Sequence, residues 1–387
     1  MSEKPRLLEG IQVVDLTSVV FGPYCTQLLA EMGAEVVKVE PPLGDIFRRA
    51  GVPAQTAAMG PCHMTLNRGK KSAVLDLKSP KDAALMHALL ARADVFIHNV
   101  RGRAIEQLGF GYDALKAIHP GLVYVHCVGF GSDGPYAGLQ AYDDVIQAAS
   151  GMTTFETRVD GNPRPRYVPS TIADKVAGMH AAYATLAGCI HKLRTGEGQL
   201  IEVPMFECFT QFLYEEHLFG GTFDPPTGPI GYPRQIDPAR QPYATKDGYI
   251  SIVPYGDESF MRAFDVLGAP EFLHQPDFAT PVQRAASVSV FYAKIAELTP
   301  AKTTGEWLEL LQAAQVPAMA VRDMSAIRQD PHLVATDFFE RRIHPTEGAY
   351  FSMRPPVRFS AAPEREVAHA PLLGEHTELL RAALLGK

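Results

Sequence analysis

The sequence predicts an α/β fold: a large domain with a Rossmann-like, mostly parallel sheet, joined to a smaller α+β domain by long connectors. Apolar strand-like segments alternate with helical ones up to about residue 130, which is typical of parallel strands joined by helices. A second apolar unit follows a stretch rich in glycine and proline, Gly220–Gln241. A chain of 387 residues is long enough for two such domains.

The first forty residues form one strand–helix–strand unit. Ile11–Leu16 is an apolar run that predicts a buried strand, and Ala34–Glu40 predicts a second. Between them, Gly22 and Pro23 open a helix that Gly33 ends. Spacing this tight indicates parallel neighbours joined by a right-handed crossover.

The remaining elements follow in order. Further strands of the large domain are predicted at Ser72–Leu77, Val95–Asn99, Leu122–Phe130 and Leu200–Val203. Its helices are predicted from Pro80, at Ala104–Leu108, Tyr112–Ile118, Asp174–Leu193 and Met205–Phe219. The second unit has a strand at Tyr249–Val253 and helices at Glu258–Leu267, Val288–Leu298 and Thr304–Ala314, and the last helix is Glu375–Leu385. We therefore assign residues 1–220 to the large domain, 221–330 to the connector and small domain, and 331–387 to a return into the large domain.

Composition narrows the class of protein. With 46% hydrophobic residues and a net charge of −7, the chain is expected to be globular and not to bind nucleic acid. The polar start does not resemble a signal peptide, and no apolar segment is long enough to cross a membrane. Five scattered cysteines without a Cys-x-x-Cys pair are typical of buried thiols in a reducing compartment. We expect a cytoplasmic protein.

The turn after the first strand argues against a dinucleotide-binding protein. That fingerprint needs three glycines, so that the backbone can approach a pyrophosphate. Thr17–Pro23 has one glycine, a bulky Phe21 and a proline without an N–H. The phosphate cradle is missing, although Glu40 lies where a ribose-binding acid would.

Basic residues gather in two places. Asn67–Ser72 contains Arg68, Lys70 and Lys71, and further cations are Lys78, Arg101 and Arg103. Because ligands of parallel sheets bind beyond the carboxyl ends of strands, these cations could hold a polyphosphate. An ordinary solvated basic loop is the alternative. The histidines show no metal-ligand spacing and are interpreted as structural.

Asp174 is the strongest candidate for a catalytic group. It begins an apolar helix, where an aspartate is also a favoured N-cap. The helix N-terminus would keep the carboxylate ionised, and the small Ala173, Ala177 and Gly178 leave room for an electrophile. The two interpretations, cap and nucleophile, are compatible.

Six segments of the chain resemble family III CoA-transferases, a group that includes formyl-CoA and carnitine CoA-transferases and the α-methylacyl-CoA racemases. The resemblance covers essentially the whole chain. The segments are Leu8–Leu16, Gly22–Pro42, Asn67–Lys78, Val128–Tyr136, Arg194–Gln199 and Ala370–Thr377.

The resemblance implies a set of site residues. Asp174, in the pattern Asp-x-x-x-Gly with Gly178, takes the place of the nucleophile. The positions that contact coenzyme A, as substrate and without a metal, are Val20, Phe21, Leu75, Lys78, Asn99, Val100, Arg101, Tyr142, Asp143 and, against the adenine, Met205. Arg103 is a plausible substitute for a family arginine whose position is Gln107 here. The resemblance also implies an interlaced homodimer, with acyl-CoA and carboxylic acids as the other partners.

Two departures narrow the reaction. The glycine run that covers the active site of formyl-CoA transferases has no counterpart in Arg234–Tyr243, which disfavours formate and oxalate. Racemases carry a histidine where this chain has Tyr142, so half of a two-base mechanism is missing. Racemase, epimerase or intramolecular acyl-CoA isomerase activity remains the alternative, and a non-catalytic CoA-binding protein is a third hypothesis.

The expected reaction is therefore CoA transfer from an acyl-CoA to a free carboxylic acid, through aspartyl anhydride and aspartyl-CoA thioester intermediates on Asp174. Arg158, Arg164 and Arg166 precede this residue closely. They could clamp the second carboxylate of an acid such as succinate, or form a solvated loop.

Overall fold

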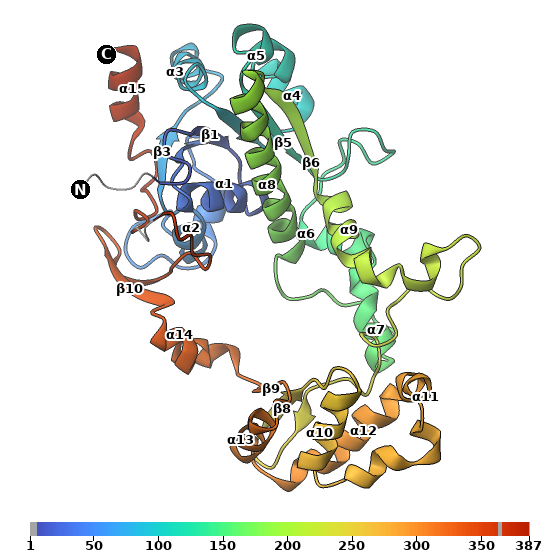
Figure 1. Cartoon of the computed structure of the whole chain (residues 1–387). Helices are drawn as coiled ribbons and strands as arrows, with labels where there is room; N and C mark the ends of the chain where they lie inside the picture. The colour runs from blue at the N-terminus through green and yellow to red at the C-terminus, as the bar shows by residue number, and fades with distance from the viewer. Residues whose placement is uncertain (1–5, 363–365, 387) are drawn as a thin grey trace. The chain divides into compact units, whose positions relative to one another are not determined.

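The computed structural model describes residues 6–362 and 366–386 and divides the chain into two compact units (Figure 1). The first unit consists of residues 1–152, 167–213 and 333–387, and the second of residues 153–166 and 214–332. No helix within the described ranges is long and apolar enough to cross a membrane.

A six-stranded parallel sheet forms the centre of the first unit, in the order β3-β2-β1-β4-β5-β6 (Figure 1). The strands are β1 (Gln12–Leu16), β2 (Glu35–Glu40), β3 (Lys70–Val74), β4 (Val95–His98), β5 (Val123–Val128) and β6 (Gln199–Pro204). The parallel α/β prediction is confirmed. The third strand, however, begins at Lys70 instead of Ser72, because its register pairs Lys70 with Val36 of β2.

Helices cover both faces of this sheet. On one face α3 (Pro80–Leu90), α4 (Gly102–Gln107) and α5 (Tyr112–Ile118) share an apolar core with Phe96 and Tyr124 of the strands. On the other face α8 (Ile172–Thr195) packs against α1 (Phe21–Glu31), β5 and β6. A Cβ at Gly188 of α8 would lie 2.7 Å from a methyl carbon of Val123, so this glycine permits the close approach of helix and sheet.

Several elements of the first unit have no counterpart among the predicted ones. These are α2 (Pro61–Leu66), α6 (Asp143–Ala149) and the antiparallel hairpin of β10 (Phe339–His344) and β11 (Gly348–Met353). The terminal helix was predicted, and it spans Thr377–Leu385 as α15, beside α3 and β3. Helix α9 (Met205–His217) begins in the first unit and ends in the second.

The second unit has a small antiparallel sheet, β7-β8-β9, formed by Tyr243–Ala244, Tyr249–Ile252 and Ala318–Ala320. Its core lies between this sheet and the helices α10 (Asp257–Val266), α12 (Val288–Leu298) and α13 (Thr304–Ala313). Three shorter helices are α7 (Phe155–Asp160), α11 (Pro281–Ala286) and α14 (Pro331–Ala335), the last at the boundary with the first unit. The strand and helices predicted here are confirmed, with bounds shifted by at most two residues.

Candidate active site

A cavity of about 440 Å³ lies in the first unit beyond the carboxyl ends of β4 and β5. Its wall includes the turn between β1 and α1, the segment after β4, the loop after β5, and Asp174 of α8. This is the edge at which parallel sheets bind their ligands. Of the predicted site residues, the cavity is lined by Phe21, Asn99, Val100, Arg101, Arg103, Tyr142, Met205 and Asp174.

Four predicted contact residues lie outside this lining. Val20 and Leu75 are buried, and Leu75 belongs to the apolar core under α3. Lys78 follows β3 and does not line the cavity, and Asp143 is buried and bonded to the start of α8. Direct contact between these four residues and CoA remains a prediction.

The basic segment Asn67–Ser72 is not a surface patch for phosphates. Lys70 is buried and donates to Asp15, Thr26 and the side chain of Asn67. Arg68 is buried in an ion pair with Glu31. The acids that neutralise these cations are distant in sequence, so the basic run looks exposed until the strands are assembled. The cations that do line the cavity are Arg101 and Arg103.

Helix α8 begins two residues before the predicted start. Its N-cap is Thr171, whose side chain makes no cap hydrogen bond, so Asp174 is the third residue of the helix and not its cap. The backbone N–H of Asp174 instead donates to Asp143 Oδ1 at 3.0 Å. A carboxylate from α6 therefore takes over the capping function, and the Asp174 side chain is left for other contacts.

Gln147 fixes this cap. Its Nε2 donates to Asp143 Oδ2 at 2.6 Å and to the carbonyl of Ser170 at 3.2 Å. Its Oε1 accepts the N–H of Val168 at 2.9 Å. One buried amide thus joins α6, the acid that caps α8, and the loop that leads into α8.

Burial and two neighbouring carboxylates raise the pKa of Asp174 to about 7. The residue is 7% exposed, and desolvation is the largest cause of the shift. The negative charges of Asp143 and Asp144 add to it, while Lys175 opposes it. The carboxylate has no ion-pair partner among the described residues. The helix N-terminus therefore does not keep Asp174 fully ionised, as the sequence led us to expect, because burial and two like charges outweigh it. Near pH 7 the carboxyl is divided between its protonated and ionised forms, and the ionised form is basic and available for attack.

The start of α1 lies directly against α8 beside Asp174. A Cβ at Gly178 would lie 2.8 Å from the carbonyl oxygen of Phe21, so only glycine allows this approach. Asp174 and Gly178 are four residues apart and share a helix face. The Asp174 side chain consequently faces the same cavity as Phe21 and the preceding turn.

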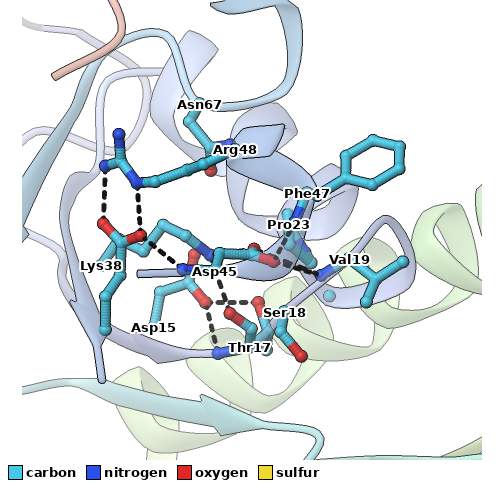
Figure 2. Close-up of polar contacts among 12 residues, drawn as sticks. Asp15, Thr17, Ser18, Val19, Pro23, Lys38, Asp45, Phe47, Arg48 and Asn67 are labelled. Carbon is cyan, nitrogen blue, oxygen red and sulfur yellow. Dashed lines mark hydrogen bonds and ion pairs between the residues drawn. The ribbon is translucent and has the colours of Figure 1, made fainter. Parts of the chain in front are cut away.

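A second set of buried acids lies beneath that turn and is fully paired (Figure 2). Asp15 bonds Lys70 at 3.2 Å, Asp45 bonds Lys38 at 3.0 Å, and Glu40 bonds Arg48 at 2.6 Å. The Arg48 and Lys38 charges and a hydrogen bond from Ser72 outweigh burial, and they lower the pKa of Glu40 to about 2. These groups are structural, because each charge already has its counter-charge.

Sequence reasoning missed two titratable residues of the cavity. His126 was interpreted as structural, yet it lines the cavity, with Nε2 3.0 Å from the carbonyl of Val100 and its ring stacked on His98. Glu202 of β6 also lines it and accepts the N–H of Ser132. Burial lowers the pKa of His126, so this ring is neutral near pH 7. A signal existed, because both residues precede the carboxyl ends of strands.

The three arginines predicted as a clamp belong to the second unit. Arg166 pairs with Asp160 at 2.7 Å and with Glu156 at 3.0 Å. Arg158 donates to the carbonyl of Ile230. Two of the three guanidinium groups therefore have partners within their own unit, and the clamp remains a prediction.

Comparisons with known proteins find the same family of relatives along nearly the whole chain. The family model of CoA-transferase family III matches residues 8–377. A succinate–glutarate CoA-transferase from Agrobacterium fabrum is 31% identical over 395 residues, covering 99% of this chain and 97% of the relative. A formyl-CoA:oxalate CoA-transferase from Streptomyces coelicolor is 32% identical, covering 98% and 96%. The human succinyl-CoA:glutarate CoA-transferase is 30% identical, covering 96% and 84%.

Solved structures share the fold. A CAIB/BAIF family protein from Brucella suis superposes with a TM-score of 0.82 at 29% identity, covering 98% of this chain and all of that one. The protein Rv3272 from Mycobacterium tuberculosis gives a TM-score of 0.83 at 26% identity, covering 98% and 99%. The likeness thus extends over both units.

Proposed function

The chain belongs to CoA-transferase family III, and we propose that it moves CoA from an acyl-CoA thioester to a free carboxylic acid through Asp174. The observation that supports this role is the environment of the carboxylate. It is buried, unpaired by any described cation, raised in pKa and directed into the cavity. A carboxylate with these properties is a better nucleophile than an exposed or ion-paired one.

The first half of the reaction loads CoA onto the enzyme. An Asp174 oxygen attacks the thioester carbonyl, the C–S bond breaks, and CoA leaves as a thiolate. The product is a mixed anhydride between Asp174 and the donor acid. The thiolate then attacks the aspartyl carbonyl, which releases the donor carboxylate and leaves an aspartyl-CoA thioester.

The second half repeats these steps with the acceptor. An acceptor carboxylate attacks the aspartyl carbonyl and displaces the CoA thiolate, which gives an anhydride between acceptor and Asp174. The thiolate attacks the acceptor carbonyl, so the new acyl-CoA forms and Asp174 is restored. Every step conserves the energy of the thioester, provided that the cavity excludes water.

The cavity supplies groups for the nucleotide part of CoA. Arg101 and Arg103 follow β4 at the cavity, and their guanidinium groups can pair with the phosphates. Tyr142 is exposed there, and Met205, the residue predicted to contact the adenine, is buried in the wall. We propose that CoA lies from these residues toward Asp174.

We propose a dicarboxylic acid, such as succinate, as one of the acids exchanged. The relatives are named for oxalate, succinate and glutarate, which all carry two carboxylates. The absent glycine run disfavours the formyl-CoA and oxalate pair for this chain. Equal transfer to succinate and to butyrate, measured as acceptors at the same concentration, would contradict this preference.

We also propose that the chain forms a homodimer. Helix α8 exposes an apolar stripe at helical spacing, formed by Met179, Tyr183, Ile190 and Leu193. Met179 and Tyr183 also line an open cavity of about 960 Å³ at the hairpin of β10 and β11. A stripe of this kind on a globular chain marks a surface that a partner covers. Light scattering on Leu193→Glu should then show more monomer than the unchanged protein does.

The proposed location is the cytoplasm. All five cysteines are free, and Cys25, Cys127 and Cys189 are buried. Burial raises the pKa of the Cys25 thiol to about 12, so it is inert. Buried free thiols fit a reducing compartment.

A panel of acyl-CoA donors and carboxylate acceptors tests the function, with Asp174→Asn as the inactive variant. Transfer should fall by about a thousandfold or more, because the amide cannot form the anhydride. Asp113→Asn is the matched control, since Asp113 is exposed and does not line the cavity. Unchanged transfer by Asp174→Asn would rule out the proposed nucleophile.

A further inference from the structure

The turn between β1 and α1 is held in a strained conformation next to Asp174. Val19 has a φ of +72°, in the left-handed region that a β-branched residue strongly disfavours. Ser18 and Val19 line the cavity, and Phe21 follows at the first position of α1. Such a conformation persists only where the surroundings impose it.

Two buried ion-paired side chains grip the two ends of this turn (Figure 2). The carbonyl of Thr17 accepts Lys38 Nζ at 2.7 Å. The N–H of Val19 donates to both oxygens of Asp45, at 3.1 and 3.2 Å. Lys38 and Asp45 also form an ion pair with each other at 3.0 Å, so the side chains that bind the two ends of the turn are linked.

Asn99 forms two hydrogen bonds with the backbone in the middle of the turn. The N–H of Ser18 donates to Asn99 Oδ1 at 3.1 Å, and Asn99 Nδ2 donates to the carbonyl of Ser18 at 3.0 Å. Asn99 follows β4, the strand next to β1. Both ends of its amide are therefore engaged with the backbone of one residue. Together with Asp15, which accepts the N–H of Thr17 at 2.9 Å, side chains hold five backbone groups of three residues.

This arrangement exceeds what a connection between strand and helix requires. A glycine at position 19 would adopt the same φ without strain, and it would not need side-chain hydrogen bonds to hold it there. The turn also cannot move closer to α8, because the carbonyl of Phe21 already lies against Gly178. The strained wall and the nucleophile are thereby kept at a fixed separation.

We infer that Asn99 and Asp45 are positioning residues, which clamp the Thr17–Val19 turn so that it holds the thioester end of acyl-CoA at Asp174. The inference rests on the proposed function and assigns Asn99 a role different from a direct CoA contact. Its amide acts on Ser18, and Ser18 and Val19 form the wall that the substrate meets. Fixed walls of this kind accelerate reactions by limiting the orientations of the bound substrate.

The test uses three variants of the full chain: Asn99→Ala, Asn99→Ala with Val19→Gly, and Asn99→Ala with Val19→Ala. Without the hydrogen bonds from Asn99 the strained turn can relax and no longer orients the substrate. The kcat/KM for acyl-CoA should therefore fall by about tenfold. Glycine at position 19 needs no grip and should restore kcat/KM to within about threefold of the unmodified protein. Alanine removes nearly the same side chain but keeps the strain, and should restore nothing.

The Kd for free CoA, measured by calorimetry, and Tm complete the test. The Kd should rise about threefold in Asn99→Ala and recover only with glycine at position 19. A lower Tm with unchanged kcat/KM and Kd would show that the clamp is only structural and would overturn the inference. A loss that glycine does not repair would show that Asn99 contacts CoA directly and would overturn it as well.

Failure of the proposed clamp and failure of the proposed function give different results in these experiments. If Asp174→Asn still transfers CoA, the nucleophile is wrong, but the CoA Kd of the three variants still reports on the clamp. If Asp174→Asn is inactive and the Kd of Asn99→Ala equals that of the unmodified protein, the clamp fails alone.

Discussion

Two clusters of buried acids lie near the start of α1, and they differ in their counter-charges. Asp15, Glu40 and Asp45 are matched by Lys70, Arg48 and Lys38. Asp143 and Asp174 of the second cluster have no cation partner among the described residues. The pKa of Glu40 is lowered to about 2, whereas that of Asp174 is raised to about 7.

The difference shows how one fold uses equally buried carboxylates for opposite purposes. A paired carboxylate gives up its reactivity, because its lone pairs and charge are already engaged. An unpaired one costs stability when it ionises and keeps its basicity for a substrate. The first cluster therefore fixes the turn, and the second supplies the nucleophile.

Removing a cation from the paired cluster should have the largest effect on stability. Arg48→Met removes the ion-pair partner of buried Glu40 and one of the two donors to the carbonyl of Pro371, the other being His63. The free energy of unfolding should fall by about 3–5 kcal/mol. Lys71→Met is the matched control, because its pair with Glu35 is exposed and contributes at most about 1 kcal/mol. Urea titrations measure the free energy of unfolding of both variants. Equal losses in the two would contradict the proposed difference between buried and exposed ion pairs.

Removing the unpaired acid Asp174 should raise the free energy of unfolding instead of lowering it. Between pH 3.8 and about 7, native Asp174 binds a proton that the unfolded chain has released, so stability falls as pH rises through this window. Asp174→Asn removes this penalty and should stabilise the protein at pH 8 by up to about 4 kcal/mol. Near pH 4 the gain should vanish. A gain that is independent of pH would show that the charge is not its cause.

The effect of Asp143 on Asp174 should be smaller and visible in the pH profile. For the unchanged enzyme, kcat/KM should rise with pH and level off above about 7, since only the ionised Asp174 attacks. Asp143→Asn removes one of the two like charges, which should move this midpoint down by on the order of one pH unit. The amide oxygen can still accept the N–H of Asp174. An unmoved midpoint would remove Asp143 from the causes of the shift.

The strands and their parallel order could be predicted because burial on both faces leaves continuous apolar runs. Ile11–Leu16 and Val95–Asn99 are such runs, and they match β1 and β4 closely. The hairpin of β10 and β11 could not be predicted, since polar and basic residues such as Arg341 and Arg342 interrupt its pattern. The hairpin is specified by pairing and by tertiary contacts such as Arg68 with Ser352.

The candidate site was predictable in its main residue and not in its surroundings. Asp174 stands out locally, but the acid that caps its helix lies 31 residues earlier. Asn99 holds a turn 81 residues earlier in the chain. Neither partner leaves a signal in a local pattern, because the Asn99 contact requires β1 and β4 to be neighbours and the Asp143 contact requires α6 to pack on α8. The burial of Lys70 has the same origin, since its partner Asp15 is 55 residues away.

Trapping of the covalent intermediate tests the central claim most directly. The enzyme is incubated with an acyl-CoA and hydroxylamine without an acceptor acid, and its peptides are analysed by mass spectrometry. An anhydride or thioester on Asp174 reacts with hydroxylamine, so a hydroxamate should appear at Asp174 and be absent from Asp174→Asn. Transfer activity accompanied by no hydroxamate, or by one on another carboxylate, would contradict the account.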